Sequence, residues 1–185
     1  MAIKLNGDFE IARTPEEVFT FLTDPNKFCP LLPEFQGLTV QDPTHFNVKV
    51  NVGISYIKGT ADVKMELAET DHPKRAQYKG QGNVAGGGAT LVAGFDLEPT
   101  PTGTKVAWQG EAQVFGRLTS VAGGLLVPLG KKQIQKLIDG LQNALRSQES
   151  RGIEGLQNAL QAQESGGADR VQSALQSDNS GGIPS

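Results

Sequence analysis

The sequence has little of several residue types, and each shortage argues against a class of protein. The 185 residues include one cysteine, Cys29, so there is neither an internal disulfide framework nor a zinc site built from several cysteines. Seventeen Lys and Arg against 20 Asp and Glu give a net charge of −3, without a concentrated basic cluster. This argues against a nucleic-acid-binding face as the main function, because phosphate binding needs concentrated positive charge.

Long apolar runs are also missing. The longest nearly apolar run, residues 121–129, is less than half of the roughly 20 residues that span a bilayer. Asp8 stands where an export signal would need its apolar region. We therefore expect a cytoplasmic protein with no export signal and no membrane span.

The motifs of common active sites are missing as well. The sequence contains no phosphate-binding loop, no G-x-S-x-G and no H-E-x-x-H. Residues 80–85 fit the loose G-x-G-x-x-A dinucleotide pattern, but strand-like sequence continues on both sides of them. We expect His45 and His72 at the surface and Cys29 as a buried, inert thiol, and the carboxylates are dispersed. The prediction is a protein that is not an enzyme, with no catalytic residues and no metal ligands.

Composition divides the chain near Leu145. All aromatic residues lie at or before Phe115, and beyond Leu145 the chain consists mainly of Gln, Ser, Gly, Ala and Asn. Three similar units follow one another at a step of 15 residues, at 138–145, 153–160 and 168–175. We expect a compact domain over residues 1–145 and a polar repeat tail over residues 146–185 that is weakly helical or disordered. The tail is either a docking segment that becomes ordered on a partner or a duplication without a selected structure.

Strand periodicity dominates the domain. Apolar residues alternate with polar ones from Phe46 to Phe115, whereas helical spacing occurs near the N-terminus and after about Leu118. Thr14, followed by Pro15 and Glu17, is typical of a helix start. Strands are expected at about residues 2–12, 35–41, 45–52, 55–69, 75–85, 88–98 and 103–115.

The last helix of the domain carries an apolar stripe. Ile134, Leu137, Ile138, Leu141 and Leu145 recur at steps of three and four residues, so they share one side of a helix. Short connections between the strands allow antiparallel neighbours but not parallel crossovers. The predicted fold is therefore α+β: a curved antiparallel sheet of about seven strands wrapped on a long C-terminal helix, with two short helices after the first strand.

The inward face of this sheet is apolar and contains many small residues. Glycine and alanine there leave either close contact between backbone and helix or an apolar cavity, and both interpretations stay open. The residues that would line a cavity are Val48, Val50, Ala61, Val63, Met65, Tyr78, Leu91, Ala93, Phe95, Val106, Trp108 and Gly110. Val121 and Leu125 join them from the segment 116–130. This segment is a flap at the mouth of the cavity, a piece that touches a membrane surface, or an irregular buried helix with a proline kink.

The order of elements resembles the helix-grip architecture of the START and Bet v 1-like (SRPBCC) superfamily. Residues 18–37 resemble the V-W-x-x-L-x-D-P-x-x-L-x-x-C-I-P-G region of the G-subunit family of carbon monoxide dehydrogenase. Phe19 replaces the usual Trp, and the C-I-P-G core is present only as Cys29-Pro30 with a later Pro33. Further similar segments are residues 52–59, 80–82 and 116–130, and the resemblance covers about residues 2–145.

The resemblance implies an accessory protein that binds an apolar ligand, a quinone or a lipid, without a covalent cofactor. Its partner would be a molybdenum hydroxylase of the carbon monoxide dehydrogenase type, which it would help to recruit to the membrane or to deliver electrons to quinone. The location would be cytoplasmic, with peripheral contact at the inner face of the cell membrane. The polar tail departs from the more hydrophobic C-terminal segment that family members often have.

Two alternatives remain at this point. An enzyme of the same superfamily, an aromatase, cyclase or hydrolase, would need polar groups that project into the cavity. A structural adaptor would have a filled core and would recruit its partner through the repeats.

Overall fold

The computed structural model describes residues 1–54, 57–84, 86–122 and 124–176, with side chains except at 84, 121–122, 148–156 and 161–176. The first elements are β1 (Ala2–Ile11), α1 (Pro15–Thr23), α2 (Pro25–Phe28) and the 3-10 turn η1 (Cys29–Leu31). The strands that follow are β2 (Phe35–Val40), β3 (His45–Ile54), β4 (Ile57–Asp71), β5 (Arg75–Val84), β6 (Gly87–Thr100) and β7 (Gly103–Gly116). The last elements are α3 (Arg117–Ala122) and α4 (Leu126–Gln176).

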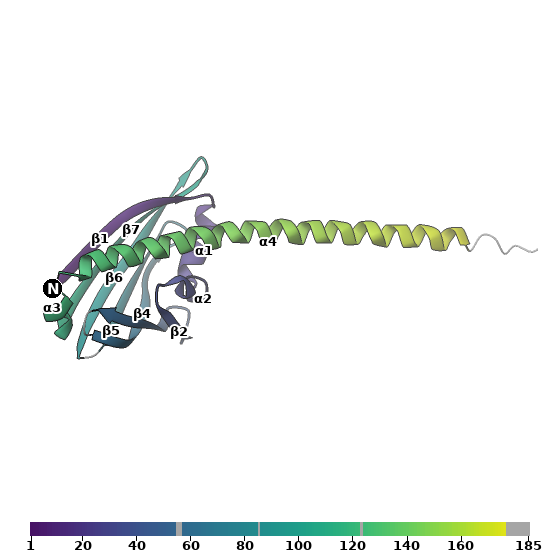
Figure 1. Ribbon diagram of the computed structural model, residues 1–185. Helices are drawn as coiled ribbons and strands as arrows, with labels where there is room; N and C mark the ends of the chain where they lie inside the picture. The colour runs from purple at the N-terminus through teal and green to yellow at the C-terminus, as the bar shows by residue number, and fades with distance from the viewer. Residues whose placement is uncertain (55–56, 85, 123, 177–185) are drawn as a thin grey trace, which may run out of the picture. The chain divides into compact units, whose positions relative to one another are not determined.

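The strands form one antiparallel sheet of seven, in the order β1-β7-β6-β5-β4-β3-β2 (Figure 1). Consecutive strands pair as hairpins from β2 to β7, and β1 joins the far edge by pairing with β7. The strand bounds lie within two residues of those predicted from the alternation of apolar and polar residues. The predicted fold class is confirmed.

Helix α1 begins at a capping box. The backbone N–H of Glu17 donates to Oγ1 of Thr14 at 3.3 Å, and the carboxylate of Glu17 accepts from the backbone N–H of Thr14 at 3.0 Å. Pro15 occupies the first turn, where a missing N–H costs nothing. The helix thereby begins where the sequence predicted, and it buries Val18, Phe19 and Phe21.

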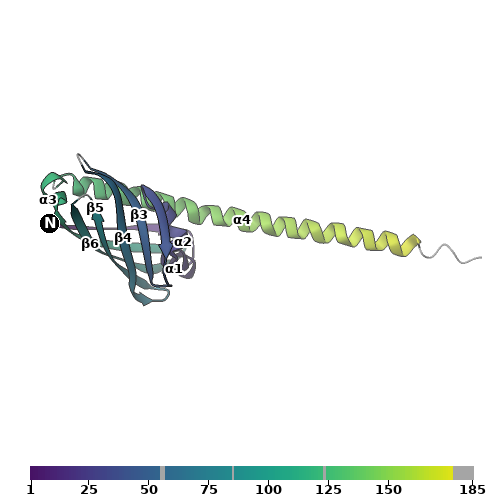
Figure 2. The same cartoon turned by 90° about the horizontal axis from the view of Figure 1, so that it is seen from below.

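The chain divides into two compact units, Met1–Leu145 and Arg146–Ser185. In the first unit, α1, α2 and the beginning of α4 lie on the same face of the sheet (Figures 1 and 2). Ile138, Leu141 and Leu145 of α4 are buried, and Leu141 and Leu145 pack with residues of several strands in one hydrophobic cluster. The predicted apolar stripe is therefore the surface with which α4 covers the sheet.

The second unit is helical up to Gln176. We expected short helices separated by the glycine-containing spacers, and α4 instead runs through them without a break. The many Gln, Ala, Leu, Glu and Arg residues around each glycine are good helix formers, which accounts for this continuity. That the tail is only weakly helical in solution stays a prediction.

Residues 116–130 contribute to two separate helices, α3 and the beginning of α4. Gly116 has φ +72°, and a Cβ there would lie 2.8 Å from the carbonyl oxygen of Gly86, so glycine allows the sharp turn into α3. Pro128 stands in the first turn of α4, where no hydrogen bond from its nitrogen is needed. The expected alternative of a buried helix kinked by this proline is therefore wrong, because the proline begins a helix.

Candidate functional site

The predicted inward residues on the strands share one face of the sheet. Val48 pairs with Val63, and Val63 with Gly82. Further along the sheet, Ala93 pairs with Gly110. Because directly opposite residues in a sheet point to the same side, the register brings all of the predicted strand residues onto one surface, beneath the helices.

The end of this face beneath α1 is filled by protein side chains. Val48, Tyr78, Phe95 and Val106 are all less than 9% exposed and belong to one hydrophobic cluster. Phe95 lies edge-on to Phe19 of α1, with ring centroids 6.1 Å apart. These predicted ligand residues form the packed core of the domain at this end.

Tyr78 has a structural task there. Its hydroxyl donates a hydrogen bond to the carbonyl oxygen of Leu22 at 2.8 Å and so joins β5 to α1. Its ring packs between Phe28 and Phe46, with centroids at 5.6 and 6.0 Å. Burial raises the pKa of Tyr78, so the phenol stays protonated.

Trp108 lies against the backbone of the edge strand β1. A Cβ at Gly7 would lie 2.8 Å from Cζ2 of Trp108, so only glycine lets the indole approach this closely. The indole Nε1 is buried and has no hydrogen-bond partner among the described residues. Trp108 therefore fills space beside β1.

A second hydrophobic cluster lies toward α3. It is built around Ile57, Ala61, Val114 and Leu118. Val50 and Val63, two further predicted residues, pack against it. This cluster seals the part of the sheet from which β7 leads into α3.

The small residues between the two clusters include examples of both interpretations, close contact between backbone and helix and space that no side chain fills. Over Gly80, a Cβ would lie 2.6 Å from Sδ of Met65 and 2.9 Å from Cγ of Leu91, so these side chains fill that position. At Gly130 of α4, a Cβ would lie 3.0 Å from Cδ1 of Leu5, so the helix approaches β1 closely. A Cβ on Gly110 would meet no atom within 4 Å. Unfilled space therefore remains beside Gly110.

A cavity of about 710 Å³ opens between α4 and the sheet near β2. Its apolar walls include Val50 and Val52 of β3 and Leu129 of α4. It forms where the short strand β2 begins, because the pairing with β3 extends no further than Phe35 and Val50. The volume lies within the range of about 300 to 1,000 Å³ that is typical of small-molecule sites.

Polar groups line the same cavity. They include Glu34, Lys58 and Gln133. Glu34 has φ +59°, and its carbonyl oxygen accepts a hydrogen bond from the backbone N–H of Asn51 at 2.9 Å. Oε1 of Gln133 is buried without a hydrogen-bond partner among the described residues. The cavity thus combines apolar walls with a few groups that can form hydrogen bonds.

The cavity only partly coincides with the predicted ligand residues. Val50 lines it, whereas Leu129, Gln133 and Glu34 were not among those predicted. The predicted strand lengths did not indicate this place, which depends on the register of β2 against β3. Leu125 is 55% exposed at the α3–α4 connection, and the side chain of Val121 lies outside the described residues.

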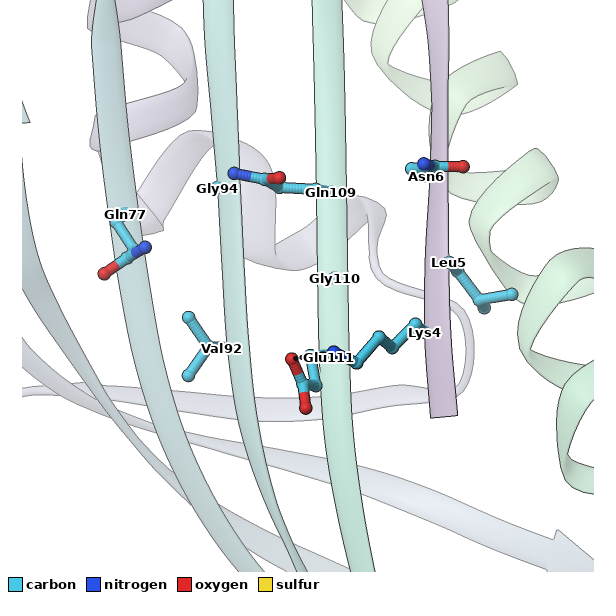
Figure 3. A pocket seen from close by; sticks show the side chains of 9 residues that line it. All are labelled: Lys4, Leu5, Asn6, Gln77, Val92, Gly94, Gln109, Gly110 and Glu111. Carbon is cyan, nitrogen blue, oxygen red and sulfur yellow. Dashed lines mark ion pairs between the residues drawn. The ribbon is translucent and has the colours of Figure 1, made fainter. Parts of the chain in front are cut away.

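The outer face of the sheet carries a second, smaller hollow of about 410 Å³ (Figure 3). Lys4 of β1 and Glu111 of β7 form an ion pair across it at 3.3 Å. Gln77 and Gln109 border it from β5 and β7, and Gly94 of β6 lies between them (Figure 3). Its paired charges and uncharged amides suit a solvated surface.

The titratable residues singled out in the sequence are not a reactive site. Cys29 is fully buried, as predicted, and burial raises the pKa of its thiol to about 12, which disfavours the reactive thiolate. His45 and His72 are exposed, as predicted. Hydrogen bonds, first from the backbone N–H of Thr44 and then from His45, hold the pKa of Asp42 at about 2. Within the described part of the chain, no three potential metal ligands lie together.

An antiparallel sheet that wraps a C-terminal helix and leaves a cavity beside it defines the START-like class of ligand-binding folds. The chain belongs to the CoxG family, the G-subunit family of carbon monoxide dehydrogenase, which matches residues 7–146. This is a family of accessory proteins rather than of catalytic enzymes. Family and fold together are those of a ligand-binding accessory protein.

Solved structures share this fold. A conserved protein from Geobacillus kaustophilus has a TM-score of 0.71 at 21% identity, over 78% of this chain and 96% of its own. A START superfamily protein from Mycobacterium smegmatis has a TM-score of 0.55 at 13% identity, over 79% of this chain and 97% of its own. No curated protein matches the sequence. Among the described helices, none has an apolar stretch long enough to cross a bilayer.

Proposed function

We propose that this protein binds a quinone or a lipid between its sheet and α4, as an accessory to a molybdenum hydroxylase of the carbon monoxide dehydrogenase type. The observation that carries the proposal is the cavity of about 710 Å³ with walls from Val50, Val52 and Leu129. Gly110 does not line this cavity, but it stands on the same inward face, beside space that no side chain occupies. Membership of the family supports the choice of partner enzyme and the recruitment to the membrane.

The chemistry of the cavity favours a ligand with an apolar chain and a polar head. Each methylene of an isoprenoid or acyl chain that leaves water contributes about 0.8 kcal/mol to binding. Glu34, Lys58 and Gln133 can form hydrogen bonds with the oxygen atoms of a head group. A purely polar metabolite would bury no apolar surface against the apolar walls, so the hydrophobic contribution to binding would be missing.

The first test is native mass spectrometry of the purified full-length protein, followed by organic extraction of what it releases. A quinone or lipid that copurifies with the protein supports the proposal. If several preparations carry nothing and decylubiquinone does not bind, the proposal fails. Quenching of Trp108, the sole tryptophan, reports on this binding without a label.

A matched pair of variants tests where the ligand lies. Gly110→Leu adds a side chain to the unfilled space on the inward face, so we expect binding at least about tenfold weaker while the circular dichroism spectrum is kept. Gly37→Leu is the control, because a Cβ there also meets no atom within 4 Å. Gly37 pairs with Lys49, on the opposite face of β2 and β3 from Leu38 and Val48. Undiminished binding in Gly110→Leu would contradict this placement of the ligand.

A further inference from the structure

One end of the first unit contains no acidic residue. Four stretches of the sequence meet there, and none of them contains Asp or Glu: residues 1–3, 52–60, 82–90 and 112–133. Antiparallel pairing brings them together, because Ala2 pairs with Gln113, Ile54 with Ile57 and Gly87 with Gly116. Both views show the N-terminus, α3 and the beginning of α4 at this end (Figures 1 and 2). We name these four stretches the acid-free end.

Exposed cations occupy the acid-free end. They are Lys58, Arg117, Lys131 and Lys132. The carboxylates nearest in sequence are engaged elsewhere, since Glu111 pairs with Lys4 at 3.3 Å and Asp62 with Lys49 at 3.8 Å. The local charge is therefore positive although the whole chain is at −3.

Large apolar side chains are exposed at the same end. Met1, Phe115, Leu125 and Val127 are 41, 45, 55 and 38% exposed. Among the described residues only Val40, Val92 and Leu160 of the remaining large apolar side chains are comparably exposed. An acid-free surface that combines protruding apolar side chains with lysine and arginine is suited to the interface of an anionic bilayer.

This end also supplies part of the wall of the cavity. Val52, Ile54, Lys58 and Leu129 belong both to the acid-free end and to the lining of the cavity. Its only carboxylate, among the lining residues, is Glu34, on the β2 side. An apolar ligand that left a bilayer here would reach the cavity without crossing water.

We infer that the acid-free end is a docking surface for an anionic lipid bilayer, through which the cavity takes up and releases its ligand. This inference rests on the proposed function, which it deepens by naming the surface that contacts the bilayer. Protruding apolar side chains at an end that also supplies part of a cavity with apolar walls favour a lipid surface over an acidic protein. The docking surface belongs to the first unit, and the repeat tail is not needed for it.

The experiment is cosedimentation of the full-length chain with vesicles of phosphatidylcholine, with and without roughly one third phosphatidylglycerol. We expect binding to the anionic vesicles that is at least about tenfold tighter than to the neutral ones and that weakens in high salt. Lys131→Glu with Lys132→Glu, and separately Leu125→Asp with Val127→Asp, should each reduce it by at least about tenfold. A protein that does not bind anionic vesicles, or that binds both kinds equally, overturns the inference.

Matched controls separate this surface from general charge and hydrophobicity. Lys64→Glu with Lys79→Glu makes the same charge change at exposed positions of β4 and β5. Val92→Asp removes an apolar side chain that is 39% exposed on β6. We expect both controls to bind vesicles within about twofold of the unaltered chain. Equal losses in the controls and in the test variants also overturn the inference.

A separate readout distinguishes this inference from the proposed function. Lys131 and Lys132 do not line the cavity, so their charge reversal should leave the binding of decylubiquinone in vesicle-free solution unchanged. Vesicle binding without any quinone binding supports the lipid surface and counts against the proposed ligand. Quinone binding without vesicle binding supports the proposed ligand and counts against the lipid surface.

Discussion

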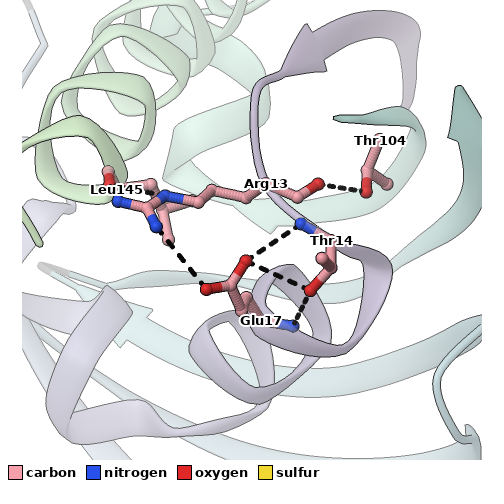
Figure 4. A network of polar contacts seen from close by, with 5 residues as sticks. All are labelled: Arg13, Thr14, Glu17, Thr104 and Leu145. Carbon is pink, nitrogen blue, oxygen red and sulfur yellow. Dashed lines mark hydrogen bonds and ion pairs between the residues drawn. The ribbon is translucent and has the colours of Figure 1, made fainter. Parts of the chain in front are cut away.

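The guanidinium of Arg13 donates two hydrogen bonds to the carbonyl oxygen of Leu145, from Nε at 3.1 Å and from Nη2 at 2.8 Å (Figure 4). The same guanidinium lies 3.5 Å from the carboxylate of Glu17 in α1. The carbonyl oxygen of Arg13 accepts a hydrogen bond from the hydroxyl of Thr104, at 2.6 Å. One residue in the turn after β1 thereby connects α1, β7 and α4.

Replacing Arg13 should lower the stability of the fold. Arg13→Ala removes both hydrogen bonds to Leu145, and bonds from a charged donor contribute about 1.5 to 3 kcal/mol. We expect a loss of about 2 kcal/mol in the free energy of unfolding, measured by urea denaturation. Arg13→Lys should recover part of it, because an ammonium cannot reproduce the forked geometry. Arg75→Ala, which breaks the exposed pair with Asp96, is the control and should change little. Equal losses for Arg13 and Arg75 would show that the link to Leu145 contributes nothing.

The capping box makes stability depend on pH. The backbone N–H of Thr14 is the largest cause that lowers the pKa of Glu17 below its ordinary value of 4.5. A carboxyl group whose pKa falls on folding stabilises the protein fully above its unfolded pKa, and this contribution is lost as the pH falls through the folded pKa. Between about pH 5 and pH 3, the unaltered protein should therefore lose more thermal stability than Glu17→Gln does. Glu16→Gln, at the neighbouring exposed position, should follow the unaltered protein. If Glu17→Gln and the unaltered protein lost the same amount of thermal stability over this pH range, the prediction would be contradicted.

Burial should protect the thiol of Cys29. Its pKa of about 12 leaves roughly one thiol in ten thousand ionised at pH 8, and reagents must also reach a fully buried sulfur. We expect folded protein to react with Ellman's reagent only as fast as it opens, and protein in guanidinium chloride to react at once. A folded protein that reacts as fast as free cysteine would contradict the buried position between α2 and the sheet.

The strands were predictable because their signal is local. Apolar residues alternate over β3 to β7 so regularly that the inward face of each strand can be assigned from its own sequence, without reference to the neighbouring strand. The start of α1 was predictable for the same reason, since Thr14, Pro15 and Glu17 interact within one turn.

The contents of the inward face were not predictable in this way. Tyr78 and Gly110 stand on the same face, yet one is packed between two phenylalanines and the other adjoins unfilled space. The difference depends on where α1, α2 and α4 approach the sheet. Alternation shows which way a side chain points but not what it meets.

The sequence by itself determined the seven strands, their common apolar face, the helix that covers it and the resemblance to the CoxG family, because local periodicity and short motifs encode these features. Only the tertiary structure decided that the end beneath α1 is filled, that a cavity forms where β2 begins, and that four acid-free stretches meet at one end of the domain. These features depend on distances between residues far apart in the chain. Such distances arise when helix and sheet pack together, and no single segment carries them.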